Sequence, residues 1–160
     1  MGSLEMILKR PFREEEIEWR IQQSGSNNNG VWAMVLAYVE ARAIQDRLDE
    51  AFGVNGWKTH YDFISDGVVC TLSVKNSEEW VDKQDGAPKT DVEPFKGGIS
   101  GAFKRVAAAG YGIGRYLYKL DTKFAETSIT KVNGWRRAKT KDGTFFYWTP
   151  PILPKWALPK

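Results

Sequence analysis

Hydrophobic positions in the first third of the chain recur mostly at helical spacing. The positions that step by three or four are Met34, Ala37, Ala41, Ile44, Leu48 and Phe52. This spacing is typical of one apolar stripe on a helix, so we predict a long helix over 31–52 that ends at Gly53. Four glutamates among residues 14–18 suit the first turns of a shorter helix over 13–22. The polar segment "SGSNNNG" at 24–30 is predicted to be a loop.

From Trp57 the period changes to two, which indicates half-buried strands. A first strand is predicted over 57–63, the S-D-G at 65–67 is a turn signal, and a second strand follows. Its inward side is expected to hold Val68, Cys70, Leu72 and Val74. Residues 78–81 are predicted as a short third strand, and 82–93 as a loop.

The second half of the chain is expected to begin with a helix over 98–110. Ile99, Phe103 and Val106 lie on one predicted face, and Gly110 is expected to cap the C-terminal end. Residues 129–139 and 144–149 flank "KDG" and predict a late hairpin. The tail "TPPILPKWALPK" is expected to be extended and anchored by Trp156 and Leu158.

Length and composition predict one domain over 1–160 with a packed core and extended ends at 1–10 and 150–160. No apolar stretch of 18 residues is present, so we expect no membrane segment. The start lacks the pattern of a signal peptide. A single cysteine suits a reducing cytoplasm.

Basic charge is concentrated, although the net charge is only +3. Two segments, 94–120 and 131–141, contain no acidic residue. Their bases are Lys96, Lys104, Arg105, Arg115, Lys119, Lys131, Arg136, Arg137, Lys139 and Lys141. Aromatic residues lie among them, and bases with aromatic rings are what single-stranded nucleic acid needs. A solvated helix face with core aromatics fits the same pattern, so charge alone leaves both interpretations open.

Nucleotide, zinc and thiol chemistry are not predicted. The phosphate loop G-x-x-x-x-G-K-[ST] does not occur, and Gly110, Gly112 and Gly114 follow a predicted helix rather than a strand. One His and one Cys give no zinc spacing. Cys70 is expected in the core and His60 on the polar side of its strand. Acidic residues that could in principle gather around a metal are Asp62, Asp66, Glu78, Glu79 and Asp82.

Several separated motifs then occur in order: A-R-x-x-Q-D-R-L-D, F-G-x-N-G-W, a K-R pair and G-I-G-R-Y-L-Y. In this combination the chain resembles the Rad52/Rad22 single-strand annealing family, and most of all its bacterial and phage branch of DdrA-like and Sak-like proteins. The resemblance covers about residues 10–160. It implies an α+β fold: a β-β-β-α core with an accessory long N-terminal helix and a late β-hairpin, assembling into a ring or helical filament.

The resemblance also implies ATP-independent binding and annealing of single-stranded DNA in repair or recombination, with no catalytic residue, metal or cofactor. The K-R pair is Lys104 and Arg105, which are expected to contact phosphates from the open side of their helix. Arg42 agrees with the bacterial A-R pattern, and Arg115 either compensates for an arginine missing among 107–109 or is structural. Val54 stands where the family has a tyrosine.

From the basic segments, Lys96, Arg136 and Arg137 complete the predicted DNA-binding set. The implied partners are single-stranded DNA and further copies of the chain, with no membrane and no nucleotide. The implied location is the cytoplasm, at the nucleoid of a bacterial or phage-infected cell. Two alternatives stay open: a metal-dependent nuclease that uses the acidic residues, and a protein that coats and protects strand ends without annealing.

Overall fold

The computed structural model describes residues 3–160. Within this range the strands form three antiparallel sheets of three strands, with orders β1-β2-β6, β3-β4-β5 and β7-β9-β8. The α-helices are α1 (Leu4–Lys9), α2 (Ala41–Phe52) and α3 (Pro94–Tyr111). The predicted mixed α+β class is therefore confirmed.

The strands of the first two sheets are β1 (Ile17–Asn27), β2 (Gly30–Val39), β6 (Lys123–Phe124), β3 (Trp57–Ile64), β4 (Gly67–Asn76) and β5 (Glu79–Pro88). Those of the third sheet are β7 (Glu126–Ser128), β8 (Arg136–Lys139) and β9 (Phe145–Thr149). Short 3-10 helices lie at Glu14–Glu16, Arg115–Lys119 and Lys155–Ala157.

The central unit is the predicted β-β-β-α arrangement of β3, β4, β5 and α3. The inward side of β4 is buried as expected, and Phe103 and Val106 of α3 are 3 % and 1 % exposed. The third strand is longer than predicted, because residues 82–88 continue the pairing with β4. The helix also runs past Gly110, and its left-handed cap is Gly112 at φ 80°.

The N-terminal third contains a hairpin where we predicted helices. Residues 17–27 form β1, not a helix and a loop, and residues 30–39 form β2, which pairs with it. Ile17, Trp19 and Ile21 alternate with polar residues, and this period of two belongs to a strand. The predicted long helix is thus wrong over 31–39 and right over 41–52, where α2 ends at Gly53 with φ 80°.

The late hairpin and the termini follow the prediction in part. Strands β8 and β9 form the hairpin across residues 140–144, but residues 129–135 are not a strand. The N-terminal end is not extended, since residues 4–9 form α1. In the tail, Leu158 packs on the core as expected, whereas Trp156 is 52 % exposed and Leu153 is buried in its place.

A buried arginine fastens the N-terminal segment to α2. Arg47 is 5 % exposed, and its Nη1 donates hydrogen bonds to the carbonyl oxygens of Ile7 at 3.1 Å and Arg10 at 2.7 Å. Its guanidinium lies 4.1 Å from the ring centroid of Phe12, which is fully buried. Hydrogen bonds and ring contact together compensate for the burial of the charge.

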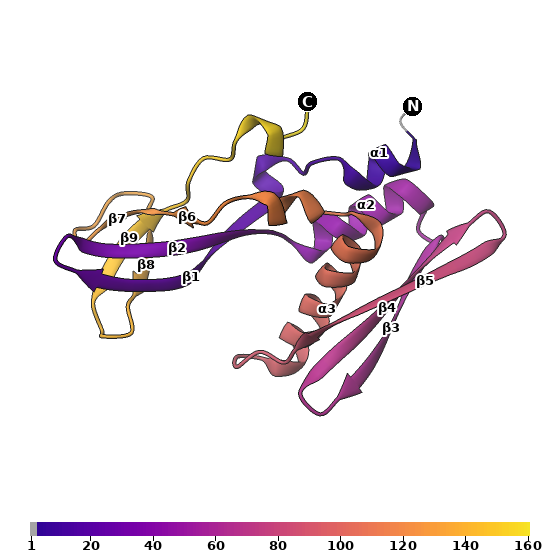
Figure 1. The fold of residues 1–160 in the computed structure, drawn as a ribbon, viewed down its shortest axis with the longest axis horizontal. Helices are drawn as coiled ribbons and strands as arrows, with labels where there is room; N and C mark the ends of the chain where they lie inside the picture. Colours follow the sequence, from indigo (N-terminus) through magenta and orange to yellow (C-terminus); the bar gives the residue numbers. More distant parts are fainter. Residues whose placement is uncertain (1–2) are drawn as a thin grey trace.

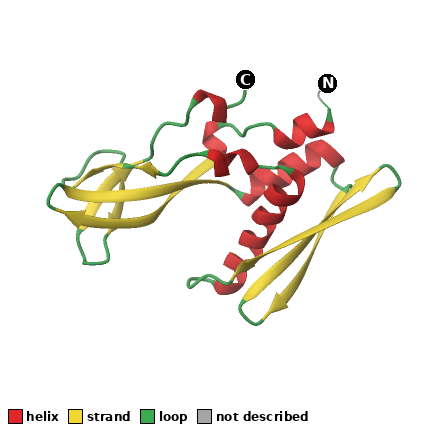
Figure 2. Ribbon diagram, in the orientation of Figure 1, coloured by secondary structure: helices red, strands yellow, loops and turns green. Residues whose placement is uncertain are grey.

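The β1-β2-β6 sheet and the β3-β4-β5 sheet lie on opposite sides of the helices (Figure 1). The β1–β2 hairpin extends to one side together with the β7–β9–β8 sheet, and the β3–β4–β5 sheet lies on the other side. The helices gather between them (Figure 2). The end of β2 contacts the middle of α3, where Lys104 lies against the ring of Tyr38. No helix within residues 3–160 is long and apolar enough to cross a membrane.

Candidate nucleic-acid interface

The two adjacent bases of α3 face different neighbours. Successive residues of a helix are turned by about 100°. Lys104 is half-buried, and its Nζ lies 4.6 Å from the ring centroid of Tyr38 in β2. Arg105 is exposed, and its Nε lies 3.6 Å from the carboxylate of Asp85 in β5. The expectation that both bases point to the open side is right for Arg105 and wrong for Lys104.

Lys104 belongs to a group of charges around Tyr38. The guanidinium of Arg20, in β1, lies 5.8 Å from the same ring. Burial lowers the pKa of Lys104 from its usual value, and repulsion from Arg20 lowers it further. Burial likewise raises the pKa of Tyr38, while Arg20 and Arg136 oppose that rise. Arg20 and Lys104 therefore lie beside the ring of Tyr38, and Arg136 is near enough to influence its hydroxyl.

Two carboxylates accompany these cations. Glu18 and Glu40 both act on the pKa of Lys104 and of Tyr38, so they lie near enough to compensate part of the positive charge. The group formed by Arg20, Lys104 and Arg136 around Tyr38 is called the cation–tyrosine cluster below. With three cations against two carboxylates it keeps an excess of positive charge, which an incoming anion would neutralise.

Arg136 is held in place from β8. Its Nη1 donates a hydrogen bond to the carbonyl oxygen of Trp19 at 3.0 Å, and its guanidinium lies 5.0 Å from the ring centroid of Trp148. Trp148 is buried, so Arg136 packs against a ring that is itself fixed in the core. A cation fixed by an acceptor and a ring loses little conformational freedom when it binds a ligand.

Two members of this cluster, Arg20 and Tyr38, were not predicted. Both fall in segments that we expected to be helical. The signal was present in β1, since Glu18 and Arg20 alternate with Ile17, Trp19 and Ile21. Strand alternation would have placed Arg20 on an open face opposite the buried Trp19.

The structure does not bring the other predicted bases to this cluster. Arg137 lies on a separate surface, 4.1 Å from the ring centroid of Phe145. Lys96 is exposed near the start of α3, with its Nζ 3.8 Å from Glu93. Arg42 is exposed in the first turn of α2. Their contacts with DNA stay predictions.

Arg115 has a structural partner. Its Nε donates to the carbonyl oxygen of Ala108 at 2.8 Å, and its Nη2 donates to that of Ala109 at 3.0 Å. These carbonyls belong to the last turn of α3, where backbone donors are scarce. Ala108 also accepts from the Gly112 N–H at 3.1 Å, and Arg115 adds a charged donor to both carbonyls. A cation at this end also suits the helix dipole. The geometry favours the structural one of the two roles expected for Arg115.

Comparison with known proteins agrees with the motifs. Residues 1–136 match the family described as "Rad52/22 family double-strand break repair protein". The chain belongs to the Rad52/22 family. It is also similar to the "Single-stranded DNA-binding protein DdrA" of Deinococcus radiodurans, at 30% identity over 99% of this chain and 69% of that protein. The protein of the same name from Deinococcus deserti is 29% identical over 99% of this chain and 72% of its own length.

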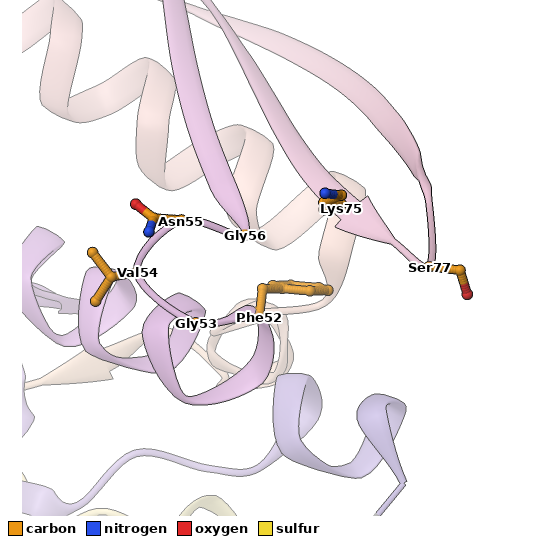
Figure 3. A pocket seen from close by; sticks show the side chains of 7 residues that line it. All are labelled: Phe52, Gly53, Val54, Asn55, Gly56, Lys75 and Ser77. Atoms are coloured by element: carbon orange, nitrogen blue, oxygen red, sulfur yellow. The ribbon is translucent and has the colours of Figure 1, made fainter.

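The F-G-x-N-G-W segment that the family resemblance rests on forms a loop between α2 and β3. It lines a shallow depression with Lys75 and Ser77 from the end of β4 and its turn. In Figure 3 the Phe52 side chain points toward the end of β4, while Val54 and Asn55 point away from it. Val54 is 75 % exposed where the family has a tyrosine, so this position presents no aromatic ring to solvent.

Residues weighed for other chemistry lie as expected for structural ones. Cys70 is buried, and burial raises the pKa of its thiol to about 11, so the thiol is protonated at neutral pH. The His60 side chain is mostly exposed, 3.3 Å from Asp62. Within residues 3–160 no three His, Cys, Asp or Glu residues are grouped as metal ligands.

Proposed function

We propose that this protein binds single-stranded DNA and anneals complementary strands in DNA repair, without a nucleotide and without a covalent step. The observation that carries this proposal is the cation–tyrosine cluster, in which Lys104 of α3 meets Arg20 of the hairpin beside Tyr38. Membership of the Rad52/22 family and the names of the two DdrA relatives support it.

Phosphate is the group that this cluster suits best. In the free protein, burial and Arg20 both disfavour the charged form of Lys104. A phosphate placed between Arg20 and Lys104 would relieve their repulsion and replace lost hydration. Phosphate contacts carry no sequence information, so binding should depend little on base sequence. They also leave base edges free, which pairing with a second strand requires.

The protein is further proposed to work as an assembly of several copies, in a ring or a filament. It exposes 10535 Å², whereas a compact monomer of 18.2 kDa exposes about 8,100 Å². Strands β1 and β3 are both sheet edges, and an edge strand can pair with another chain; on β1 the Trp19 carbonyl already accepts from Arg136. Side-by-side copies would cover part of this surface and align their cation–tyrosine clusters along one strand. We place this activity in the cytoplasm, at the nucleoid.

A strand-annealing assay tests the proposal. Two complementary strands labelled with a donor and an acceptor dye are mixed with the protein in EDTA and without ATP. We expect faster pairing than in buffer alone, because no catalytic metal is needed. Strand binding without faster pairing would favour the coating alternative, and strand cleavage that EDTA abolishes would favour the nuclease alternative.

A double variant connects this activity to the cluster. Arg20→Ala with Lys104→Ala should weaken binding and slow annealing in a folded protein. The matched control, Arg13→Ala with Lys155→Ala, removes the same charge from exposed positions outside the cluster. Equal losses in both proteins would mean that only net charge matters. Light scattering and negative-stain imaging of the unaltered protein test the assembly, and a monomer with and without DNA would contradict it.

A further inference from the structure

One face of the β1–β2 hairpin carries an apolar and aromatic stripe that leads away from the cation–tyrosine cluster. Alternation in β2 buries Ala33, Val35 and Val39 on one face. The other face holds Trp32, Met34, Leu36 and Tyr38, and β6 adds Phe124 beside Met34. This face stays partly open, since Leu36 is 37 % exposed and Phe124 is 61 % exposed.

At the far end of the stripe the indole of Trp32 packs against β1. Trp32 pairs with Gly25 of β1, and a Cβ placed on Gly25 would lie only 2.9 Å from Cζ2 of Trp32 and 3.1 Å from its Cε2. The indole edge that carries Nε1 therefore lies against the backbone at Gly25. Trp32 is only half-buried, so part of its ring is accessible.

Phe124 stands at the side of this indole. The two ring centroids are 6.4 Å apart, and the ring planes meet at 70°. Two rings at this steep angle form a corner in which a planar group can stack on Trp32 and touch Phe124. Such platforms hold unpaired bases, since every base has a π face.

We propose that Trp32 and Phe124 form a stacking site for one unpaired base of the strand whose phosphates bind at the cation–tyrosine cluster. This inference rests on the proposed function. Trp32 and Tyr38 are six positions apart in β2, which is about 20 Å of strand. That length matches about six nucleotides at the 3.4 Å spacing of stacked bases, and fewer in an extended strand. The cations at the Tyr38 end of the same face favour a nucleic acid over a second protein copy as the occupant.

A base held in this way remains able to pair. Stacking uses the face of the base, whereas pairing uses its edge. The site would thus distinguish single strands, whose bases are free to leave the stack, from intact duplex. Phosphate contacts alone would not make this distinction as sharply.

The test compares an oligothymidine with an abasic oligomer that has the same number of phosphates. Unaltered protein should bind the oligothymidine roughly tenfold more tightly. Trp32→Ala should remove most of this preference and leave the affinity for the abasic oligomer unchanged. The matched control is Trp80→Ala, since Trp80 is 39 % exposed on the other sheet and should not matter.

A second variant keeps the tryptophan. Gly25→Ala places a methyl group under the indole and should tilt it from the sheet, with a smaller loss of the same preference. It also carries the test if Trp32→Ala does not fold. A preference that survives in folded Gly25→Ala and Trp32→Ala proteins would overturn the inference. So would a change in oligomer size without DNA in these variants, because the face would then contact another copy. Unaltered protein that binds neither oligomer would instead refute the proposed function.

Discussion

The ammonium group of Lys104 lies 4.6 Å from the ring centroid of Tyr38, and this contact joins α3 to the β1–β2 hairpin. The two members of the K-R pair, Lys104 and Arg105, therefore lie in different environments. Lys104 is half-buried among charges from two other segments, whereas Arg105 is exposed and paired with Asp85. The two residues are adjacent in sequence and should not contribute equally to DNA binding.

Lys104→Ala should weaken single-strand binding more than Arg105→Ala. Loss of a charged hydrogen bond to phosphate corresponds to about tenfold in affinity. Each lost phosphate contact should also reduce the slope of log K against log salt by about 0.7. Arg105 must first break its ion pair with Asp85, so its contribution to the affinity for single strands should be smaller. Filter binding at several salt concentrations measures both quantities, and an equal or larger loss in Arg105→Ala would contradict the assignment.

The affinity for single strands should fall as the pH rises through the lowered pKa of Lys104. Burial and Arg20 disfavour the charged form in the free protein, and phosphate favours it in the complex. Binding is therefore accompanied by proton uptake above the pKa of the free protein. An ordinary lysine has a pKa of about 10.4. The affinity should therefore begin to fall at a lower pH than it would if Lys104 had this ordinary pKa.

Lys104→Arg is the control for this pH dependence. A guanidinium keeps its proton throughout the range, so the variant should bind with an affinity that changes little between about pH 7 and pH 10. Titration of binding by fluorescence anisotropy gives both profiles. Parallel profiles for the two proteins would show that the proton comes from another group.

The sequence was sufficient for the elements whose period is unambiguous. Alternation from Trp57 onward predicted β3 and β4, and Cys70 lies in the core as its register required. In β2, by contrast, both faces carry apolar residues, so steps of three and four occur by coincidence. Val31, Trp32, Val35 and Val39 favoured a strand by their side-chain type, but the stripe that continues into α2 outweighed them.

The site was harder to predict than the fold. Charge and motif single out Lys104 and Arg136, but no sequence rule predicts that residues of α3 and β8 both lie near Tyr38 of β2. Arg20 and Tyr38 lie in the parts of β1 and β2 that were predicted to be helical. Because these two strands were not predicted, two of the four residues of the cation–tyrosine cluster were not predicted either.

Arg47→Met should lower stability without a direct effect on DNA binding. The change leaves the carbonyl oxygens of Ile7 and Arg10 without a side-chain donor in a buried region. Unsatisfied buried acceptors cost about 1–3 kcal/mol. Urea denaturation should show this loss, and binding by the remaining folded protein should match the unaltered protein. Unchanged stability would mean that water replaces the guanidinium.

Arg115→Ala should also lower stability, by about 1 kcal/mol, because two carbonyls at the C-terminal end of α3 lose a charged side-chain donor, although Ala108 keeps the Gly112 N–H. Arg115→Lys should restore only part of it, since an ammonium lacks the fork that reaches both acceptors. Thermal denaturation ranks the three proteins. A drop in DNA affinity at unchanged stability would assign Arg115 to the interface instead.

Arg20→Ala should change two quantities in opposite directions. Removing its charge takes away one cause of the lowered pKa of Lys104, so this pKa should rise. The same change removes a cation from the cation–tyrosine cluster, so single-strand affinity should fall although Lys104 is more fully protonated. Titration of the labelled Lys104 side chain by NMR gives the first quantity, and filter binding gives the second. A residue that merely stabilises the hairpin would leave the pKa of Lys104 where it is. Unchanged affinity together with a raised pKa would show that Arg20 repels Lys104 but does not meet the strand.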